Sequence, residues 1–238
     1  MKRAGFTLFE CLLGLALSLW IAAAGFELFA RAQKAFDRLK VREEAGQAAL
    51  AALDRMRIDL LHAGRGLAVE IGLGLVEAAQ AAADELRTVS LERRLALAAA
   101  AGAGDTRIFL AATSEIAAGQ AIILRDGAAG EVRTVVSVDP GSVAVDAPIE
   151  RAYLPASASL SLLETVAYRL DGPARVLRRR VNASPAQPLC ESVAAASWTL
   201  DAAAHLVRLR LEPGTEGAHA HEATIFLKNA ALAARYRP

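Results

Sequence analysis

A chain of 238 residues is long enough to hold one or two domains with a buried core, and 54% of its residues are hydrophobic. Its formal net charge is only +1, which excludes binding driven by a large excess of one charge, so we expect no nucleic-acid partner. The two cysteines, Cys11 and Cys190, lie at opposite ends of the chain and are poor candidates for a disulfide.

The first 26 residues combine a short basic leader with an apolar run. Lys2 and Arg3 belong to the leader, residues 1–5, and residues 6–26 carry a single charge, on Glu10. These twenty-one residues are enough to cross the roughly 30 Å hydrocarbon core of a membrane as a helix. Because the basic residues precede the run, the positive-inside tendency predicts a single-pass membrane protein whose amino terminus is cytoplasmic and whose remainder lies outside.

Three residues of this segment form a motif: Gly5 ends the leader, Phe6 follows it, and Glu10 lies five residues beyond the glycine. This combination resembles the processing signal of type IV prepilins and of type II secretion pseudopilins. The resemblance implies that the protein is anchored in the inner membrane with a periplasmic carboxy-terminal domain, and later enters a pilus or pseudopilus. It further implies that a prepilin peptidase cuts between Gly5 and Phe6 and methylates the new terminal amine of Phe6. It also implies that Glu10 pairs with the Phe6 amine of a neighbouring subunit, in the low dielectric of a membrane or filament core.

Three other interpretations of the amino-terminal segment compete with this one. An ordinary secretory signal could be cleaved after Ala22-Ala23-Ala24, but Glu10 would then be an unexplained charge in its apolar region. A lipoprotein signal ending at Cys11 would need small residues where Phe9 and Glu10 stand. A plain membrane anchor would carry an acid that costs about 2.5–3.5 kcal/mol at the bilayer centre. The prepilin interpretation alone explains the glycine, the phenylalanine and the acid together.

Residues 27–63 continue the helical pattern. The pattern predicts one helix from Phe6 to about His62, which ends in a loop at Gly64 and Gly66. Its later part carries apolar residues at the spacing of an amphipathic helix and is expected to pack on a carboxy-terminal domain. These residues are Ala49, Ala52, Leu53, Met56 and Leu60, and an earlier stripe consists of Phe29, Ala32, Phe36 and Leu39.

Residues 64–238 alternate between apolar and polar positions, which predicts a β-rich periplasmic domain of antiparallel hairpins. Within it we expect a β insertion at 105–151 and a short alanine-rich helix over 95–104. Turn signals stand at 126–127, 139–141, 171–173 and 213–214. Four groups of alternating residues predict strands: Val132, Thr134, Val136 and Val138; Leu160, Leu162, Val166, Tyr168 and Leu170; Val207, Leu209 and Leu211; Ala223, Ile225 and Leu227. The expected class is α+β, a pilin-like fold with a long transmembrane and then amphipathic helix packed on an antiparallel sheet.

The order of residues 164–170, 177–179 and 187–193 resembles that of W-type minor pilins (PilW-like) and of J-type minor pseudopilins of type II secretion. The resemblance implies a minor pilin that helps to initiate or cap assembly of a type IV pilus, or alternatively a J-type pseudopilin. The implied partners are prepilin peptidase, other minor pilins and the major pilin, the inner-membrane assembly platform and membrane lipid. A hypothesis of another class is a membrane-anchored or secreted β-domain binding protein or a hydrolase.

Few residues outside the amino terminus suggest chemistry. His219 and His221 lie two apart and could seed a metal site, but no cysteine or further histidine is near in sequence, and we expect no metal or other cofactor. His62 and His205 fit a helix end and a strand edge. The basic run 178–180 fits a solvated strand face. No catalytic motif is found in the sequence, so we expect no enzyme activity.

Overall fold

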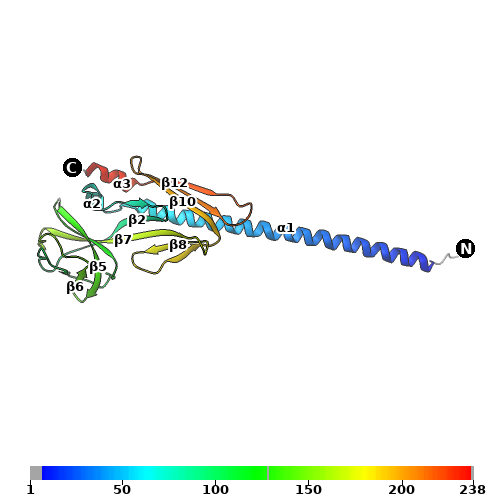
Figure 1. The fold of residues 1–238 in the computed structure, drawn as a ribbon, viewed down its shortest axis with the longest axis horizontal. Helices are drawn as coiled ribbons and strands as arrows, with labels where there is room; N and C mark the ends of the chain where they lie inside the picture. Colours follow the sequence, from blue (N-terminus) through cyan, green and yellow to red (C-terminus); the bar gives the residue numbers. More distant parts are fainter. Residues whose placement is uncertain (1–6, 128, 237–238) are drawn as a thin grey trace. The chain divides into compact units, whose positions relative to one another are not determined.

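A computed structural model describes residues 7–127 and 129–236. The chain divides into two compact units, of which the first ends at Glu44 and the second begins at Ala45. One helix, α1 (Leu8–His62), contributes to both units and is followed by strands (Figure 1). A long amino-terminal helix followed by antiparallel sheet confirms the α+β class. The predicted helix start at Phe6 lies outside the described residues.

The part of α1 in the first unit is built from residues that form helices well. Leucine and alanine dominate it and there is no proline, so nothing interrupts the backbone hydrogen bonds. Oppositely charged side chains four positions apart pair along its surface, Arg31 with Glu27 and Lys40 with Glu44. Such pairs add only a few tenths of a kcal/mol each.

The part of α1 in the second unit packs into the core. Ala49, Ala52, Leu53, Met56 and Leu60 are all buried, as the spacing predicts. The helix then ends at a loop in which Gly64 and Gly66 have φ values of 75° and 74°. The Gly64 N–H donates to the Val89 carbonyl at 2.7 Å, so the chain leaves the helix by joining the edge of a strand.

The large sheet contains nine strands in the order β1-β2-β7-β4-β5-β6-β3, with β8 on β7 and β9 on β8. A short helix, α2 (Ala68–Gly72), precedes it. The strands are β1 (Ala79–Ala81), β2 (Glu85–Leu95), β3 (Arg107–Phe109), β4 (Ala121–Asp126), β5 (Ala129–Asp139), β6 (Ser142–Val145), β7 (Ala158–Asp171), β8 (Val176–Val181) and β9 (Gln187–Cys190). Every pairing between these described strands is antiparallel.

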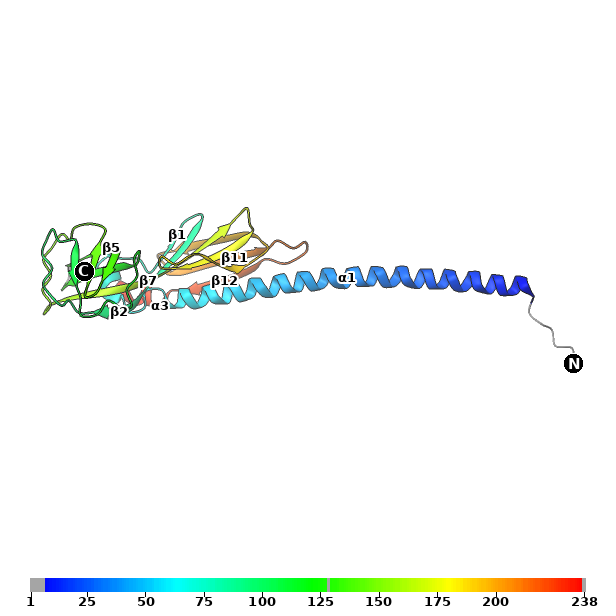
Figure 2. The ribbon, with the colours of Figure 1, turned by 90° about the horizontal axis from the view of Figure 1, so that it is seen from below.

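A second sheet has three strands in the order β10-β11-β12, and Figure 2 shows β11 beside β12. They are β10 (Val193–Asp201), β11 (Leu206–Pro213) and β12 (His221–Phe226), followed by α3 (Lys228–Ala233) and the 3-10 turn η1 (Ala234–Tyr236). One apolar cluster joins α1 to both sheets. It includes Met56 and Leu60 from the helix, Tyr168 from β7, and Val207 and Leu209 from β11.

Strand β7 passes through two cores. Its second half places Val166 and Tyr168 in the cluster around α1, and pairs with β8. Its first half pairs with β4 and places Leu160 and Leu162 in a separate cluster with β4, β5 and β6. Residues 105–151 therefore extend the large sheet by strand pairing, and their status as an insertion stays a prediction.

Most turn and strand predictions of the second unit are confirmed. Hairpins form at 126–129, 139–142 and 171–176, and β11 ends at Pro213. The predicted apolar faces of β7 and β11 are buried.

Two expectations are wrong. Residues 95–104 form no helix, because Leu97 bridges to Leu110 and Ala101 to Tyr153, and both are buried in the second core. The group Val132, Thr134, Val136 and Val138 does not line one apolar face of β5: Val132 and Val136 are 37% and 58% exposed, whereas Val138, beyond a register shift in the strand, packs against the second core.

Candidate functional site

Thr7 and Glu10 close the amino-terminal end of α1 with reciprocal hydrogen bonds. The Thr7 backbone N–H donates to Glu10 Oε2 at 2.9 Å, and the Thr7 hydroxyl donates to the same oxygen at 3.0 Å. In return the Glu10 N–H donates to Thr7 Oγ1 at 3.4 Å. This is a capping box, in which residue Ncap and residue N3 satisfy each other's backbone donors. The carboxylate therefore has a local structural role.

The structure describes part of the predicted processing site. Gly5 and Phe6, the predicted cleavage and methylation residues, lie outside the described residues. Thr7 was missed by the sequence reasoning, although the spacing Thr-x-x-Glu before an apolar run is itself a signal for a helix start. Neither bond from Thr7 uses Glu10 Oε1, so this oxygen is outside the capping box.

The surface of the same helix is strongly apolar and exposed. Leu8, Phe9, Trp20, Ile21 and Phe26 are each more than 70% exposed. Soluble surfaces seldom present so large an apolar area without a partner or a membrane. Among the described helices, α1 is long and apolar enough to cross a membrane.

The Ser18 side chain within this apolar stretch is satisfied inside the helix. The Ser18 hydroxyl donates to the Gly14 carbonyl at 2.8 Å, one turn earlier. A hydroxyl bonded in this way can enter hydrocarbon at little cost, because no donor is left without an acceptor. Cys11 is a free thiol on the same surface. Glu10 is the one charged side chain between residues 8 and 26.

The histidines do not converge. His219 lies in the loop before β12 and His221 is the first residue of that strand, while His62 ends α1 and His205 lies in the turn before β11. In the part of the chain that the structure describes, no group of three or more His, Cys, Asp or Glu side chains could hold a metal ion. The four histidines therefore form no common site.

The basic run 178–180 is divided between two faces of β8. Arg179 points into the core, where its Nε donates to Asp59 Oδ2 at 2.7 Å. Tyr168 also donates its hydroxyl to Asp59, and Arg55 pairs with the other carboxylate oxygen at 3.4 Å. Burial, together with the hydrogen bond to Asp59, raises the pKa of Tyr168 above its ordinary value. Only Arg178 and Arg180 lie on the outer face of the sheet, so the predicted solvated face holds for two of the three arginines.

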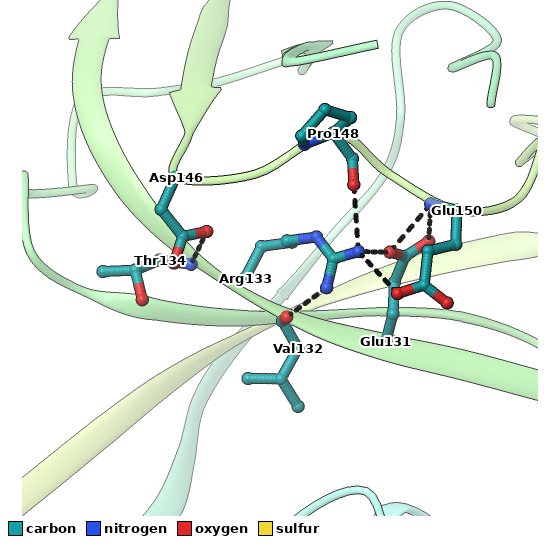
Figure 3. A network of polar contacts seen from close by, with 7 residues as sticks. All are labelled: Glu131, Val132, Arg133, Thr134, Asp146, Pro148 and Glu150. Atoms are coloured by element: carbon teal, nitrogen blue, oxygen red, sulfur yellow. Dashed lines mark hydrogen bonds and ion pairs between the residues drawn. The ribbon is translucent and has the colours of Figure 1, made fainter. Parts of the chain in front are cut away.

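A second polar network lies on the inner side of β5 (Figure 3). Arg133 pairs with Glu131 and with Glu150, and donates to the Pro148 carbonyl at 3.0 Å. Glu131 also accepts the Glu150 backbone N–H at 3.0 Å, and burial raises the pKa of the neighbouring Tyr153. These contacts tie residues 146–150 to the strand, so the network has a structural role, although Arg133 Nε and the Tyr153 hydroxyl are buried without a hydrogen-bond partner among the described residues.

No protein-family model matches the sequence. None of the curated proteins matches it either. The tailspike Gp54 of Acinetobacter baumannii bacteriophage AP22, solved with capsular saccharide of A. baumannii, is 18% identical over 32% of this chain, with a TM-score of 0.28. The tailspike gp49 of Pseudomonas phage LKA1 is 23% identical over 31% of this chain, with a TM-score of 0.27. The endosialidase of phage phi92 is 14% identical over 63% of this chain, with a TM-score of 0.22.

The alignment spans 15% of each of the two tailspike chains and 32% of the endosialidase chain. TM-scores of this size do not indicate a shared fold.

Proposed function

We propose that this chain is a minor pilin, a structural subunit that helps to initiate or cap a type IV pilus after processing by prepilin peptidase. Cleavage falls between Gly5 and Phe6, and Phe6 becomes the methylated first residue. The observation that carries the proposal is Glu10, the one charge in an apolar helix, at the position where the prepilin signal has its acid.

The apolar part of α1 supports an assembly role over an enzymatic one. Its large apolar side chains are exposed over residues 8–26, and they need either lipid or neighbouring helices around them. The stripe of Phe29, Phe36 and Leu39 is also 61–67% exposed. Apolar surface that needs neighbouring helices therefore extends beyond the membrane segment. Before assembly lipid covers the first part, and in the filament the helices of other subunits replace it.

Glu10 has the hydrogen-bonding capacity for both of its roles. Its Oε2 closes the cap with Thr7, and its Oε1 stands outside those bonds. A carboxylate can accept about four hydrogen bonds, so the cap and a bond from the Phe6 ammonium of a neighbouring subunit are compatible. In a medium of low dielectric this pair is far stronger than at a surface, and it fixes the axial position of one subunit against the next.

The subtype rests on the second unit. The order of residues 164–170, 177–179 and 187–193 resembles that of the W-type minor pilins and of the J-type pseudopilins. A J-type pseudopilin of a type II secretion system is therefore the alternative within the same class. Secretin and secretion-ATPase genes of the type II set beside this gene would favour the alternative, and pilus assembly genes would favour the minor pilin.

Substitutions at Glu10 separate its two roles. Glutamine can still close a capping box but has no charge, whereas alanine removes both the cap and the charge. We expect Glu10→Gln and Glu10→Ala to be cleaved normally and to enter the filament, or its initiating complex, at least about tenfold less than the wild type. Loss of one partner of a buried ion pair costs about 3–5 kcal/mol, which is ample for this effect.

Glu27→Gln is the matched control, because Glu27 lies on the same helix and makes only an exposed ion pair with Arg31. Incorporation is measured by quantitative mass spectrometry of sheared filaments. Wild-type incorporation of Glu10→Gln, with loss in Glu10→Ala, would show that the cap matters and that the intersubunit ion pair does not.

A further inference from the structure

A cleft of about 410 Å³ opens on the outer face of the large sheet, beside the β7–β8 hairpin. Three arginines line it, Arg169, Arg178 and Arg180, together with the carboxylates of Glu85 and Asp171. Ala167 lies on the same strand face as Arg169 and is paired directly with Arg180. Its side chain is a single methyl group, so the sheet is hollow at this point between much longer neighbours.

The register of the hairpin brings like charges together. Arg169 is the direct cross-strand partner of Arg178, and like charges in directly opposed positions destabilise a sheet. Each has a carboxylate nearby: Arg169 contacts Asp84 at 3.5 Å and Arg178 contacts Asp171 at 3.1 Å. The Arg169–Asp84 pair is exposed, and such pairs contribute little against repulsion. Arg87, opposite Ala167 on β2, also donates to Glu85 at 2.8 Å. Four arginines thus share three carboxylates around the cleft, and a bound anion would offset the surplus of positive charge.

Several guanidinium donors in the cleft are available to a ligand. Arg178 bonds Asp171 through Nε, so its two terminal amino groups lie outside that bond. Among the described residues, Arg180 makes its ion pair with Glu85 at 3.7 Å, a distance longer than a hydrogen bond. A guanidinium presents five N–H donors in a planar fork that matches the oxygens of a carboxylate or a phosphate.

The two acids in the cleft restrict the class of ligand further. Glu85 and Asp171 accept hydrogen bonds but repel anionic groups, so they suit hydroxyl donors beside the anionic group. A volume of about 410 Å³ lies at the small end of ligand pockets, which hold compact molecules. We propose that this cleft binds an acidic sugar: its carboxylate or phosphate lies against Arg178 and Arg180, and its hydroxyls donate to Glu85 and Asp171. All lining residues belong to the unit that begins at Ala45, so this site is independent of the assembly role of Glu10.

Calorimetric titration of the full chain tests the proposal. A polyoxyethylene detergent keeps the protein in solution without adding sugar or charge. The probes are glucuronate, glucose 6-phosphate, inorganic phosphate and glucose. We expect glucuronate or glucose 6-phosphate to bind with a Kd of about 1 mM or below, and inorganic phosphate and glucose to bind at least about tenfold more weakly. The preferred acid identifies whether the anionic group is a carboxylate or a phosphate.

Three variants distinguish binding in the cleft from an effect of the net charge of the protein. Arg180→Gln should weaken binding about tenfold or more, because it removes charged hydrogen bonds. Ala167→Leu keeps every charge but fills the floor of the cleft, and should abolish binding. Arg208→Gln, an exposed arginine on β11 in the other sheet, should leave it unchanged. The thermal unfolding of each variant shows whether it is folded.

Three results would overturn the proposal. The first is the absence of binding by both acidic sugars at about 10 mM. The second is an equal loss of affinity in Arg208→Gln and Arg180→Gln. The third is unchanged affinity in folded Ala167→Leu. Either result would mean that binding depends on the net charge of the protein and not on the cleft.

Discussion

Asp59 is the residue at which helix α1 and the large sheet are joined through polar groups. Its side chain is only 6% exposed and receives contacts from Arg55, Tyr168 and Arg179. Tyr168 and Arg179 lie 109 and 120 positions away in the sequence, so these hydrogen bonds hold together segments that are distant along the chain. A buried carboxylate is tolerated only with such partners, because its desolvation is costly.

Asp59→Ala is therefore expected to destabilise the second unit strongly. The substitution leaves the largely buried guanidinium of Arg179 without its carboxylate, and we expect a loss of about 3–5 kcal/mol in the free energy of unfolding. Urea denaturation of the full chain in detergent measures it. Asp54→Ala, an exposed acid on the same helix, should change the free energy by less than about 0.5 kcal/mol. Equal effects of the two substitutions would contradict a structural role for the network.

Tyr168 gives the second unit a dependence on alkaline pH. Its pKa is raised by burial and by the bond to Asp59, and burial raises that of Tyr153 as well. A group whose pKa is higher in the folded state stabilises the fold below its unfolded pKa, and this stabilisation is lost as the pH rises further. We expect the free energy of unfolding to fall above about pH 10, the ordinary pKa of tyrosine.

Tyr168→Phe should make that fall less steep, whereas Tyr236→Phe, at an exposed position, should leave it unchanged. Denaturation curves at several pH values compare the two. An unchanged slope in Tyr168→Phe would show that Tyr168 does not couple ionisation to folding.

At the scale of single residues, the sequence identifies Glu10 but not its partner Thr7 or the role of Arg179. Glu10 is conspicuous because it is one charge in an apolar run. The alternation of 178–180 shows that two arginines share a face. Which face is buried depends on Asp59, which no local pattern connects with β8.

At the scale of elements, the end of α1 depends on Gly64 and Gly66, which have left-handed backbones. Gly74, after α2, has the same backbone conformation as Gly66 and serves as a comparison. A Cβ at Gly66 would lie 2.7 Å from Leu91 Cδ2 and 2.8 Å from Leu91 Cβ, while a Cβ at Gly74 would have nothing within 4 Å. Both positions have φ of +74°, so the backbone strain of an alanine is similar in the two.

Gly66→Ala should consequently cost more than Gly74→Ala. We expect about 1 kcal/mol for Gly74→Ala from strain alone, and at least about 2 kcal/mol for Gly66→Ala, where the clash with β2 is added. Chemical denaturation of both variants measures the difference. Equal losses would mean that the helix end can move away from Leu91 without cost.

The elements that sequence predicts well are those whose pattern serves one local purpose. The stripe of α1 and the alternation of β11 each face one core, and the two halves of β7 each bury their alternating residues in one of two cores. Turn residues mark the ends of these strands. Residues 95–104 are different, because their alanines favour a helix locally but Leu97 and Ala101 are buried through bridges to distant residues. In β5 the inner face holds Glu131 and Arg133 beside Val135, so Val132 and Val136 face outward. Beyond the register shift between Val135 and Ser137, Val138 packs against the second core.

At the scale of the whole molecule, each unit has its own requirement. The second unit buries its apolar residues in cores that it builds itself. The first unit is a helix with exposed apolar side chains, and a helix gains most of its stability in proteins from the packing of its apolar face. Under the proposed function, a membrane and then the helices of other subunits supply this packing.

The mass of the mature amino terminus, measured on the protein from its native membrane, tests the central claim most directly. Our account predicts a first peptide that begins at Phe6 and carries one methyl group on its amine. A chain that begins at Gly25, after Ala22-Ala23-Ala24, or that keeps residues 1–5 would contradict it.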